Sequence, residues 1–213
     1  MDEKLKYLPV DPKPDGGWPG HTESLTEFAG RLCYQSWEKK NPATQKNADY
    51  VAHIIAQGHL SILEHSSATL YVQDVSRAFL AEITRHRHLS FSVISQRYCA
   101  PDDKPVIPPA IAGDHELVMA LTARYEEMLS WYNSLATELI SKGLKRKQAR
   151  EAARAVLPNM TPVEMVVTGN FRAWREVIQR RIAPAADAEI QQFARMALTV
   201  LSEIDSAAFA DLI

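Results

Sequence analysis

The sequence contains little cysteine, little glycine and no excess of charge of either sign. Its 213 residues include two cysteines and eight glycines, and 24 basic side chains stand against 26 acidic ones, a formal net charge of −2. Two cysteines, Cys33 and Cys99, cannot form the disulfide framework of a small secreted protein, so we expect a reducing, cytoplasmic setting. The lack of a basic excess argues against nucleic acid as a partner.

Long apolar runs are also missing. No segment approaches the roughly 18–20 consecutive apolar residues that span a bilayer. The first ten residues, MDEKLKYLPV, are charged and mixed, unlike the apolar part of a secretory signal. We therefore expect no membrane partner. A hydrophobic content of 46% with 23% charged residues is typical of a folded chain, and the length favours one domain over 1–213, with or without an appended helical hairpin.

The periodic segments predict an α+β fold, because helical patterns are interleaved with a few non-adjacent β-rich segments. Alternation and β-formers predict strands at 4–10, 66–73, 91–98 and 161–168. Apolar residues at helical spacing predict helices at 22–36, 47–57, 77–86, 114–142, 145–156, 173–182 and 186–201. Gly58 and Gly143 are expected to end two of these helices, and the prolines at 101–113 predict a loop.

Arginines are concentrated in three short stretches, 85–97, 146–154 and 172–181. Arginine is the side chain that best recognises phosphate and carboxylate groups in a two-pronged contact. A nearly neutral protein with three such stretches is typical of a protein that binds small anionic ligands.

The stretch 85–98, RHRHLSFSVISQRY, is the most polar of these. Burying so many polar groups is costly unless a ligand or partner satisfies them. If the stretch is extended, alternation places Ser95 and Arg97 on one side, toward a common target such as a phosphate. A solvated charged turn explains the same composition, so the residues alone predict an anion site and leave this alternative open.

Other patterns have structural explanations beside functional ones. His59 and His65 are six residues apart, without the i, i+4 spacing of a zinc-binding helix, so structural histidines are favoured over a metal site. The five basic residues within 145–154 could contact nucleic acid, but a solvated helix face is the simpler interpretation. Trp131 and Tyr132 are interpreted as core or subunit contacts, and Asn170 as the N-cap of a helix.

The pattern Arg85-His86-Arg87, seven residues, then Ser95 resembles the signature of the flavin-dependent thymidylate synthases. The continuation Ser95-Gln96-Arg97-Tyr98 is similar as well. Further blocks that match in the family's order are CYQSW (33–37), GHLSILEH (58–65), RKQAREAARAVLP (146–158) and VVTGNFRAWREVIQRR (166–181). Together the blocks cover most of the chain from about residue 28 to 210. The sequence of the signature itself, RHRHLSFSVISQRY, is most similar to that of the actinobacterial branch and its phages.

The resemblance implies an enzyme that converts dUMP to dTMP by reductive methylation. Methylenetetrahydrofolate would supply the one-carbon unit, and NADPH would supply the hydride through FAD. No cysteine nucleophile would be required. The family fold implied is a twisted, mainly antiparallel sheet surrounded by helices, assembled as a homotetramer whose active sites are shared between subunits.

The resemblance also implies residue roles. Arg181 would be the catalytic residue, stabilising charge on the uracil ring so that C5 becomes a carbon nucleophile. The dUMP site would comprise Glu82, Arg85, Ser95, Gln96, Arg97, Arg154 and Arg181. The FAD site would comprise His59, Ser61, Glu64, Arg85, His86, Arg87, Asn170 and Arg172. The rim would carry Tyr34, Lys147 and Arg150, and no metal is expected.

Two positions depart from the family pattern. Val93 stands where members carry a polar residue, and Glu176 stands where some members carry histidine, so flavin affinity or pose is expected to differ there. A protein that kept its arginine sites but lost productive flavin binding, and acts only as a nucleotide- or nucleic-acid-binding protein, is the alternative that these departures leave open.

Overall fold

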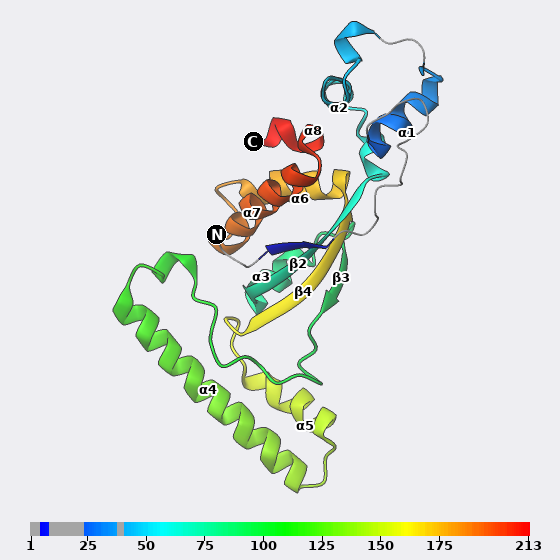
Figure 1. Cartoon of the computed structure of the whole chain (residues 1–213). Coiled ribbons are helices and arrows are strands. Elements are labelled where there is room, and N and C mark those ends of the chain that lie inside the picture. Colours follow the sequence, from blue (N-terminus) through cyan, green and yellow to red (C-terminus); the bar gives the residue numbers. More distant parts are fainter. Residues whose placement is uncertain (1–4, 9–23, 38–40) are drawn as a thin grey trace.

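A computed structural model of the chain describes residues 5–8, 24–37 and 41–213, and its core element is a small antiparallel sheet (Figure 1). The strands are β1 (Leu5–Leu8), β2 (Ser67–Ser76), β3 (Ser90–Val93) and β4 (Pro162–Asn170), in the order β1-β2-β4-β3. The helices are α1 (Leu25–Tyr34), α2 (Asn47–Ala56), α3 (Arg77–Ile83), α4 (His115–Ser141), α5 (Arg146–Ala153), α6 (Phe171–Ile182), α7 (Ala188–Ile204) and α8 (Ser206–Phe209), with a 3-10 turn η3 at Leu60–Glu64. These elements confirm the predicted α+β class.

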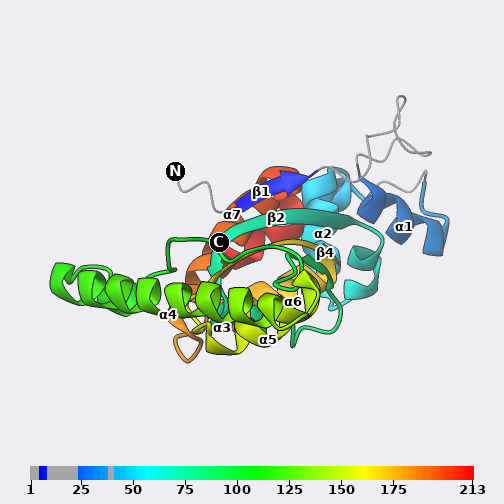
Figure 2. The same cartoon turned by 90° about the horizontal axis from the view of Figure 1, so that it is seen from below.

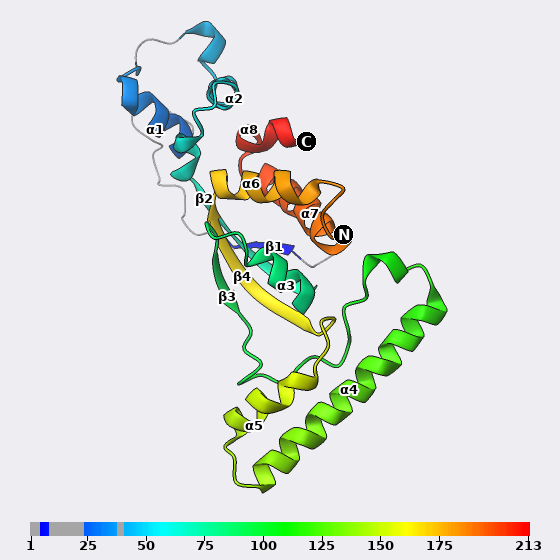
Figure 3. The same ribbon diagram turned by 180° about the vertical axis from the view of Figure 1, so that it is seen from behind.

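One face of the sheet is buried and the other is half-exposed. Along β4 the burial alternates, with Val163, Met165 and Val167 in the core and the residues between them half-buried, because successive strand side chains point to opposite faces. Helices α3, α6 and α7 pack near that face (Figure 3) and contribute Phe79, Trp174 and Phe193 to the core, which α2, η3 and α8 extend. Within one chain the helices therefore cover one face of the sheet.

Helices α4 and α5 form a hairpin that projects from one end of the sheet, opposite α1 and α2 (Figures 1 and 2). In α4 only Tyr125 and Tyr132 are buried, and burial raises the pKa of Tyr125 to about 12. Trp131 and Tyr132 were interpreted as core or subunit contacts. Tyr132 is a buried core residue, whereas Trp131 is 58% exposed. The projecting hairpin has too few neighbours in its own chain to cover the apolar residues whose helical spacing predicted the helix at 114–142.

Several predicted boundaries need correction. The strand predicted at 91–98 ends at Val93, because the chain turns at Ser95, whose carbonyl accepts hydrogen bonds from the N–H groups of Tyr98 and Cys99. The helix predicted at 77–86 ends at Ile83. Gly58 and Gly143, at φ 72° and 94°, follow the ends of α2 and α4, as predicted from glycine's access to the left-handed region. Of the strand predicted at 4–10, the part outside 5–8 lies outside the described residues.

Arg175 of α6 fastens the C-terminal end of the chain to the core. Its side chain is 5% exposed and makes a two-pronged contact with Asp211, at 2.6 and 2.7 Å, while Nη1 also donates to the carbonyl of Ala208 at 2.5 Å. Phe209 packs edge-on against Phe171, with ring centroids 5.3 Å apart. A buried guanidinium needs such partners, because an unpaired buried charge is strongly destabilising.

Asp211→Asn is expected to lower the free energy of unfolding at pH 7 by about 1–2 kcal/mol, since it removes charge-assisted hydrogen bonds from a half-exposed carboxylate. The hydrogen bonds from Arg175 lower the pKa of Asp211, so this contribution is complete above the unfolded-state pKa, near 4, and is lost as the pH falls through the folded-state value. Urea unfolding at pH 7 and pH 3 should show a difference between variant and parent that shrinks in acid. Glu203→Gln, on the exposed side of α7, is the control and should leave the free energy of unfolding unchanged at both pH values.

Candidate active site

Two predicted flavin residues meet where η3 lies against the start of α6. Nη1 of Arg172 contacts Oε1 of Glu64 at 2.6 Å, although 108 residues separate them in sequence. Asn170 caps α6 by accepting a hydrogen bond from the N–H of Ala173 at 2.8 Å, which confirms the predicted N-cap. His59 and Ser61 are exposed on the same η3 segment. The fold thus brings the blocks 58–65 and 166–181 together at one surface.

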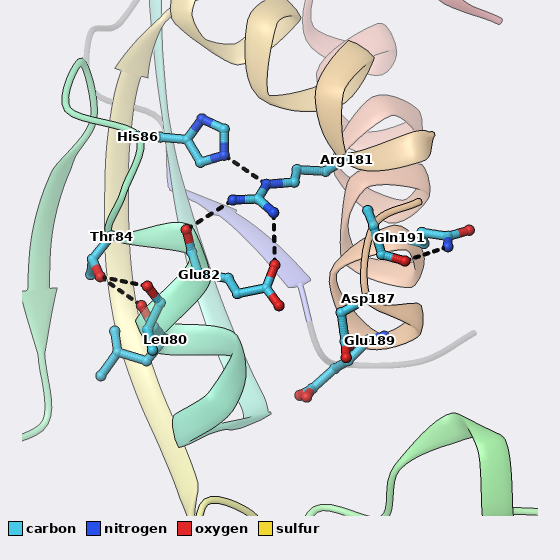
Figure 4. Close-up of polar contacts among 10 residues, drawn as sticks. Leu80, Glu82, Thr84, His86, Arg181, Asp187, Glu189 and Gln191 are labelled. Atoms are coloured by element: carbon cyan, nitrogen blue, oxygen red, sulfur yellow. Dashed lines mark hydrogen bonds and ion pairs between the residues drawn. The ribbon is translucent and has the colours of Figure 1, made fainter. Parts of the chain in front are cut away.

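A second group, formed by Glu82, His86 and Arg181, lies between the end of α3 and the end of α6 (Figure 4). Nη1 of Arg181 donates to Oε2 of Glu82 at 2.7 Å, and Nη2 donates to the backbone carbonyl of Glu82 at 3.1 Å. Nε of Arg181 donates to Nε2 of His86 at 2.9 Å. The guanidinium is mostly buried and held from three sides.

His86 is the member of this group whose pKa is shifted by its surroundings. Partial burial lowers the pKa of its imidazole, and the nearby cations Arg181, Arg180 and Arg85 lower that pKa further. The carboxylate of Glu176 acts in the opposite direction. The imidazole is therefore favoured in its neutral form at pH 7.

The turn after α3 opens into a cleft of about 350 Å³ that holds the Arg-His-Arg signature. Arg85 and Arg87 are exposed, and Glu176 of α6 pairs with Arg180 at 2.8 Å. The lining is Arg85, His86, Arg87, His88, Leu89, Ala173, Glu176, Val177 and Arg180. Arginine and histidine outnumber the one acidic side chain, so the cleft suits an anionic group.

The turn at 95–98 is fastened to α5. Nη1 of Arg150 donates to the carbonyl of Tyr98, and Nζ of Lys147 lies 5.3 Å from the centre of the Tyr98 ring. Nε of Arg97 contacts Oε2 of Glu151 at 2.8 Å in an ion pair that is not aligned as a hydrogen bond. These contacts place Ser95, Gln96 and Arg97 beside the basic helix that leads to Arg154, although the turn is not the extended strand predicted.

Arg77 is a candidate that the sequence analysis missed. It is the first residue of α3, directly after the end of β2, and Gln96 lines the same cleft of about 270 Å³. Its Nη2 reaches the carbonyl of Ile94 at 3.4 Å, and its buried Nε has no partner among the described residues. Burial and, second, the charge of Arg154 lower its pKa, so two arginines lie close together here. An arginine at the first position of a helix after a strand was the only signal available in the sequence.

Helix α3 connects this arginine group with Arg181. Arg77 begins the helix and Glu82 lies near its end, so at a rise of 1.5 Å per residue the two positions are about 7.5 Å apart along the axis. An anion held at Arg77 and Arg154 and a base held at Arg181 would lie along the same short helix. The arrangement suits an elongated ligand with a phosphate at one end.

The two departures from the family pattern lie in different surroundings. Val93 pairs with Met165 on the buried face of the sheet and packs against the core, so its side chain is committed to packing. Glu176 lies in the cleft of the Arg-His-Arg signature. Of the two, only Glu176 is placed to act on a ligand there.

Two negative results concern the described residues only. Residues 5–8, 24–37 and 41–213 contain no group of three or more histidine, cysteine, aspartate or glutamate side chains arranged to hold a metal ion. Over the same ranges, no helix combines the length and apolar character needed to cross a membrane.

Comparison with known proteins gives concordant matches. The sequence model of a family described as "Thymidylate synthase complementing protein" matches residues 19–205. A flavin-dependent thymidylate synthase of Mycobacteroides abscessus is 46% identical over 209 residues, covering 93% of this chain and 84% of the relative. A probable flavin-dependent thymidylate synthase of Mycobacterium phage L5 is 50% identical over 196 residues, covering 89% and 80%. A crystal structure of the Helicobacter pylori enzyme complexed with FAD and dUMP shares the fold, with a TM-score of 0.69 at 23% identity over 88% of this chain and 93% of that one.

Proposed function

Because the chain belongs to the flavin-dependent thymidylate synthases, we propose that it converts dUMP to dTMP by reductive methylation on FAD. Methylenetetrahydrofolate supplies the one-carbon unit, and NADPH supplies the reducing equivalents. The observation within the structure that best supports this proposal is the set of contacts that α3 organises, with Arg77 beside Arg154 at one end and Glu82 bound to Arg181 at the other.

We assign the nucleotide to the residues along α3 and the turn beside it. A phosphate dianion requires two or more fixed donors, which Arg97 and Arg154 provide, with Arg77 as a third. Ser95 and Gln96 contribute donors from the same turn, Glu82 and Arg181 contact the base, and Arg85 lies between the nucleotide and flavin sites. This is the predicted dUMP set with Arg77 added.

Arg181 carries the catalytic role in this proposal. Methylation at C5 requires negative charge to accumulate on the uracil ring, and a guanidinium fixed against the ring oxygens stabilises that charge most strongly in the transition state. Because Glu82 and His86 already hold the guanidinium, it does not have to reorganise when the base arrives. The chemistry therefore needs no cysteine, and both Cys33 and Cys99 are exposed free thiols.

The donor set of the second site fits a flavin dinucleotide. Arg85 and Arg87 are exposed cations beside a cleft, and Arg172 with Asn170, His59, Ser61 and Glu64 forms a second polar surface. We propose that these residues and His86 hold FAD, which supplies the hydride-transfer chemistry when bound. Glu176 places one carboxylate among the cations and should weaken the attraction for a pyrophosphate.

We further propose that the chain is a single domain that assembles as a homotetramer with shared active sites. Leu117, Met128 and Trp131 are exposed apolar residues that lie along one face of α4, because their spacing of 11 and 3 residues returns them to the same side of the helix. Such a row on a projecting helix is typical of a protein interface. The half-exposed face of the sheet and the exposed Arg85 and Arg87 would also be completed by other subunits.

The first test of the function is the visible absorption spectrum of the purified full-length protein. We expect FAD to bind and dUMP to perturb the flavin bands in a saturable titration, because the two sites share Arg85. NADPH oxidation that depends on methylenetetrahydrofolate and dUMP would complete the assignment. A colourless protein that does not take up added FAD, and whose nucleotide affinity falls steeply with salt, would instead favour the binding-protein alternative.

A further inference from the structure

The contact between Arg181 and His86 has a consequence for nucleotide binding that goes beyond holding a cofactor. Building on the proposed function, we propose that His86 is a positioning residue for Arg181. Its neutral imidazole, with the proton on Nδ1, holds the guanidinium in the orientation that receives uracil. Acidification then weakens dUMP binding by removing this hydrogen bond.

The hydrogen bonds of Arg181 support the positioning role. A guanidinium has five N–H donors in a rigid plane, and three are used here, by Nε2 of His86, Oε2 of Glu82 and the carbonyl of Glu82. The remaining two N–H groups have no acceptor within the described part of the chain and are left for a ligand. The contact with His86 is the only one of the three that uses Nε of Arg181 (Figure 4). It therefore determines how the guanidinium plane is rotated relative to its two contacts with Glu82.

The turn that carries His86 is itself well anchored. The hydroxyl of Thr84 donates to the carbonyl of Leu80 at 2.8 Å, and the N–H of His86 donates to the carbonyl of Ile83 at 3.1 Å. The carbonyl of His86 accepts from the N–H of Leu89 at 3.2 Å, and Leu89 is buried. The imidazole therefore projects from a fixed backbone toward Arg181.

The charges around His86 determine which protonation state is compatible with the contact. Arg181 and Arg180 of α6 and Arg85 of the turn are cationic, and Glu176 of α6 faces it with one carboxylate, while the carboxylate of Glu82 on α3 is engaged by Arg181. Because Nε2 accepts from Arg181, it cannot carry a proton. Protonation would replace a hydrogen bond with two adjacent cations. Since burial and these cations lower the pKa of His86, the contact persists at neutral pH and is lost as the pH falls through that lowered value.

The tautomer can be tested directly by NMR of ¹⁵N-histidine-labelled protein with FAD bound, using His86→Gln to identify the signal. We expect Nδ1 to carry the proton at pH 7.5 and Nε2 to show the shift of an unprotonated acceptor. A proton on Nε2, or an imidazolium at this pH, would overturn the inference. This readout does not depend on turnover or on nucleotide.

The effect on binding is tested by titrating dUMP into the FAD-bound protein at pH 7.5 and pH 5. Glutamine places an oxygen acceptor where Nε2 stands and cannot be protonated, so His86→Gln should keep the dUMP dissociation constant within about threefold at pH 7.5. On acidification the parent should lose about tenfold more affinity than the glutamine variant. The phosphate of dUMP also titrates near pH 6, but equally in both proteins. His86→Ala should bind dUMP about tenfold more weakly already at pH 7.5.

The control is His53→Gln, which replaces an exposed histidine of α2 that contacts neither site within the described ranges and should retain the acid loss of the parent. Equal acid losses in His86→Gln and the parent would overturn the positioning role. Failure of the proposed function has a different signature. In that case FAD binds to none of the proteins, and the tautomer, then measured by NMR on the protein without FAD, decides whether the His86–Arg181 contact exists.

Discussion

Replacing Arg181 with alanine is expected to abolish dTMP formation, with at least a ~10³-fold loss of kcat, while FAD remains bound. Loss of one preorganised electrostatic donor costs about 10²–10³-fold in kcat. The structure adds a second cost, because Glu82 loses the guanidinium that lies 2.7 Å from its carboxylate. Its negative charge would then face a ring that must itself become negative. Single-turnover formation of dTMP and the flavin spectrum, measured on one preparation, separate the two properties.

Two comparison variants make the Arg181 result specific. Arg181→Lys keeps the positive charge but loses the planar fork that contacts Glu82 and His86 together, so we expect an intermediate rate. Arg195→Ala removes an exposed arginine of α7 whose contact is with Gln191, and should leave turnover unchanged. Normal turnover in Arg181→Ala would show that the charge on uracil is stabilised by another group.

Local sequence signals predicted local structure well. Asn170 was predicted as a cap because an Asn side chain satisfies the N–H group three residues later whatever the rest of the chain does. Gly58 and Gly143 ended their helices because φ near 72° and 94° is costly for other residues. In contrast, the strand predicted at 91–98 stops at Val93, since docking of Tyr98 on α5 outweighs the alternating pattern. Propensity is overridden where a distant element supplies the contacts.

The same distinction explains what was predicted of the candidate site. The matching blocks predicted which residues take part, but not how they contact each other. Arg181 meets His86 and Glu82 across 95 and 99 residues of sequence, and Arg172 meets Glu64 across 108. Strand alternation does not say which face of a sheet is covered, so the packing of Val93 against the core required the fold. Arg77 lacked a motif and became visible only through its buried Nε and the nearby charge of Arg154.

Replacing Arg97 with alanine is expected to raise the dUMP dissociation constant about 10–100-fold and to leave FAD binding unchanged, because one charge-assisted contact to phosphate is lost. The loss should be partial, since Arg154 and Arg77 remain beside the same turn. In the free protein Arg97 is 40% exposed and is paired with Glu151, so the phosphate has to compete with that carboxylate. Glu151→Gln should therefore tighten dUMP binding by a few-fold, about the contribution of a surface ion pair.

The comparison of nucleotide with nucleoside shows whether Arg97 acts on the phosphate or on the shape of the site. Deoxyuridine lacks the phosphate, so Arg97→Ala and the parent should bind it with the same weak affinity. The ratio of dUMP affinity to deoxyuridine affinity should therefore fall in Arg97→Ala by the same factor as the dUMP affinity itself. If the turn at 95–98 had instead lost its position on α5, both ligands would weaken together. An unchanged dUMP dissociation constant would remove Arg97 from the phosphate site and leave Arg77 and Arg154 as the arginines that hold it.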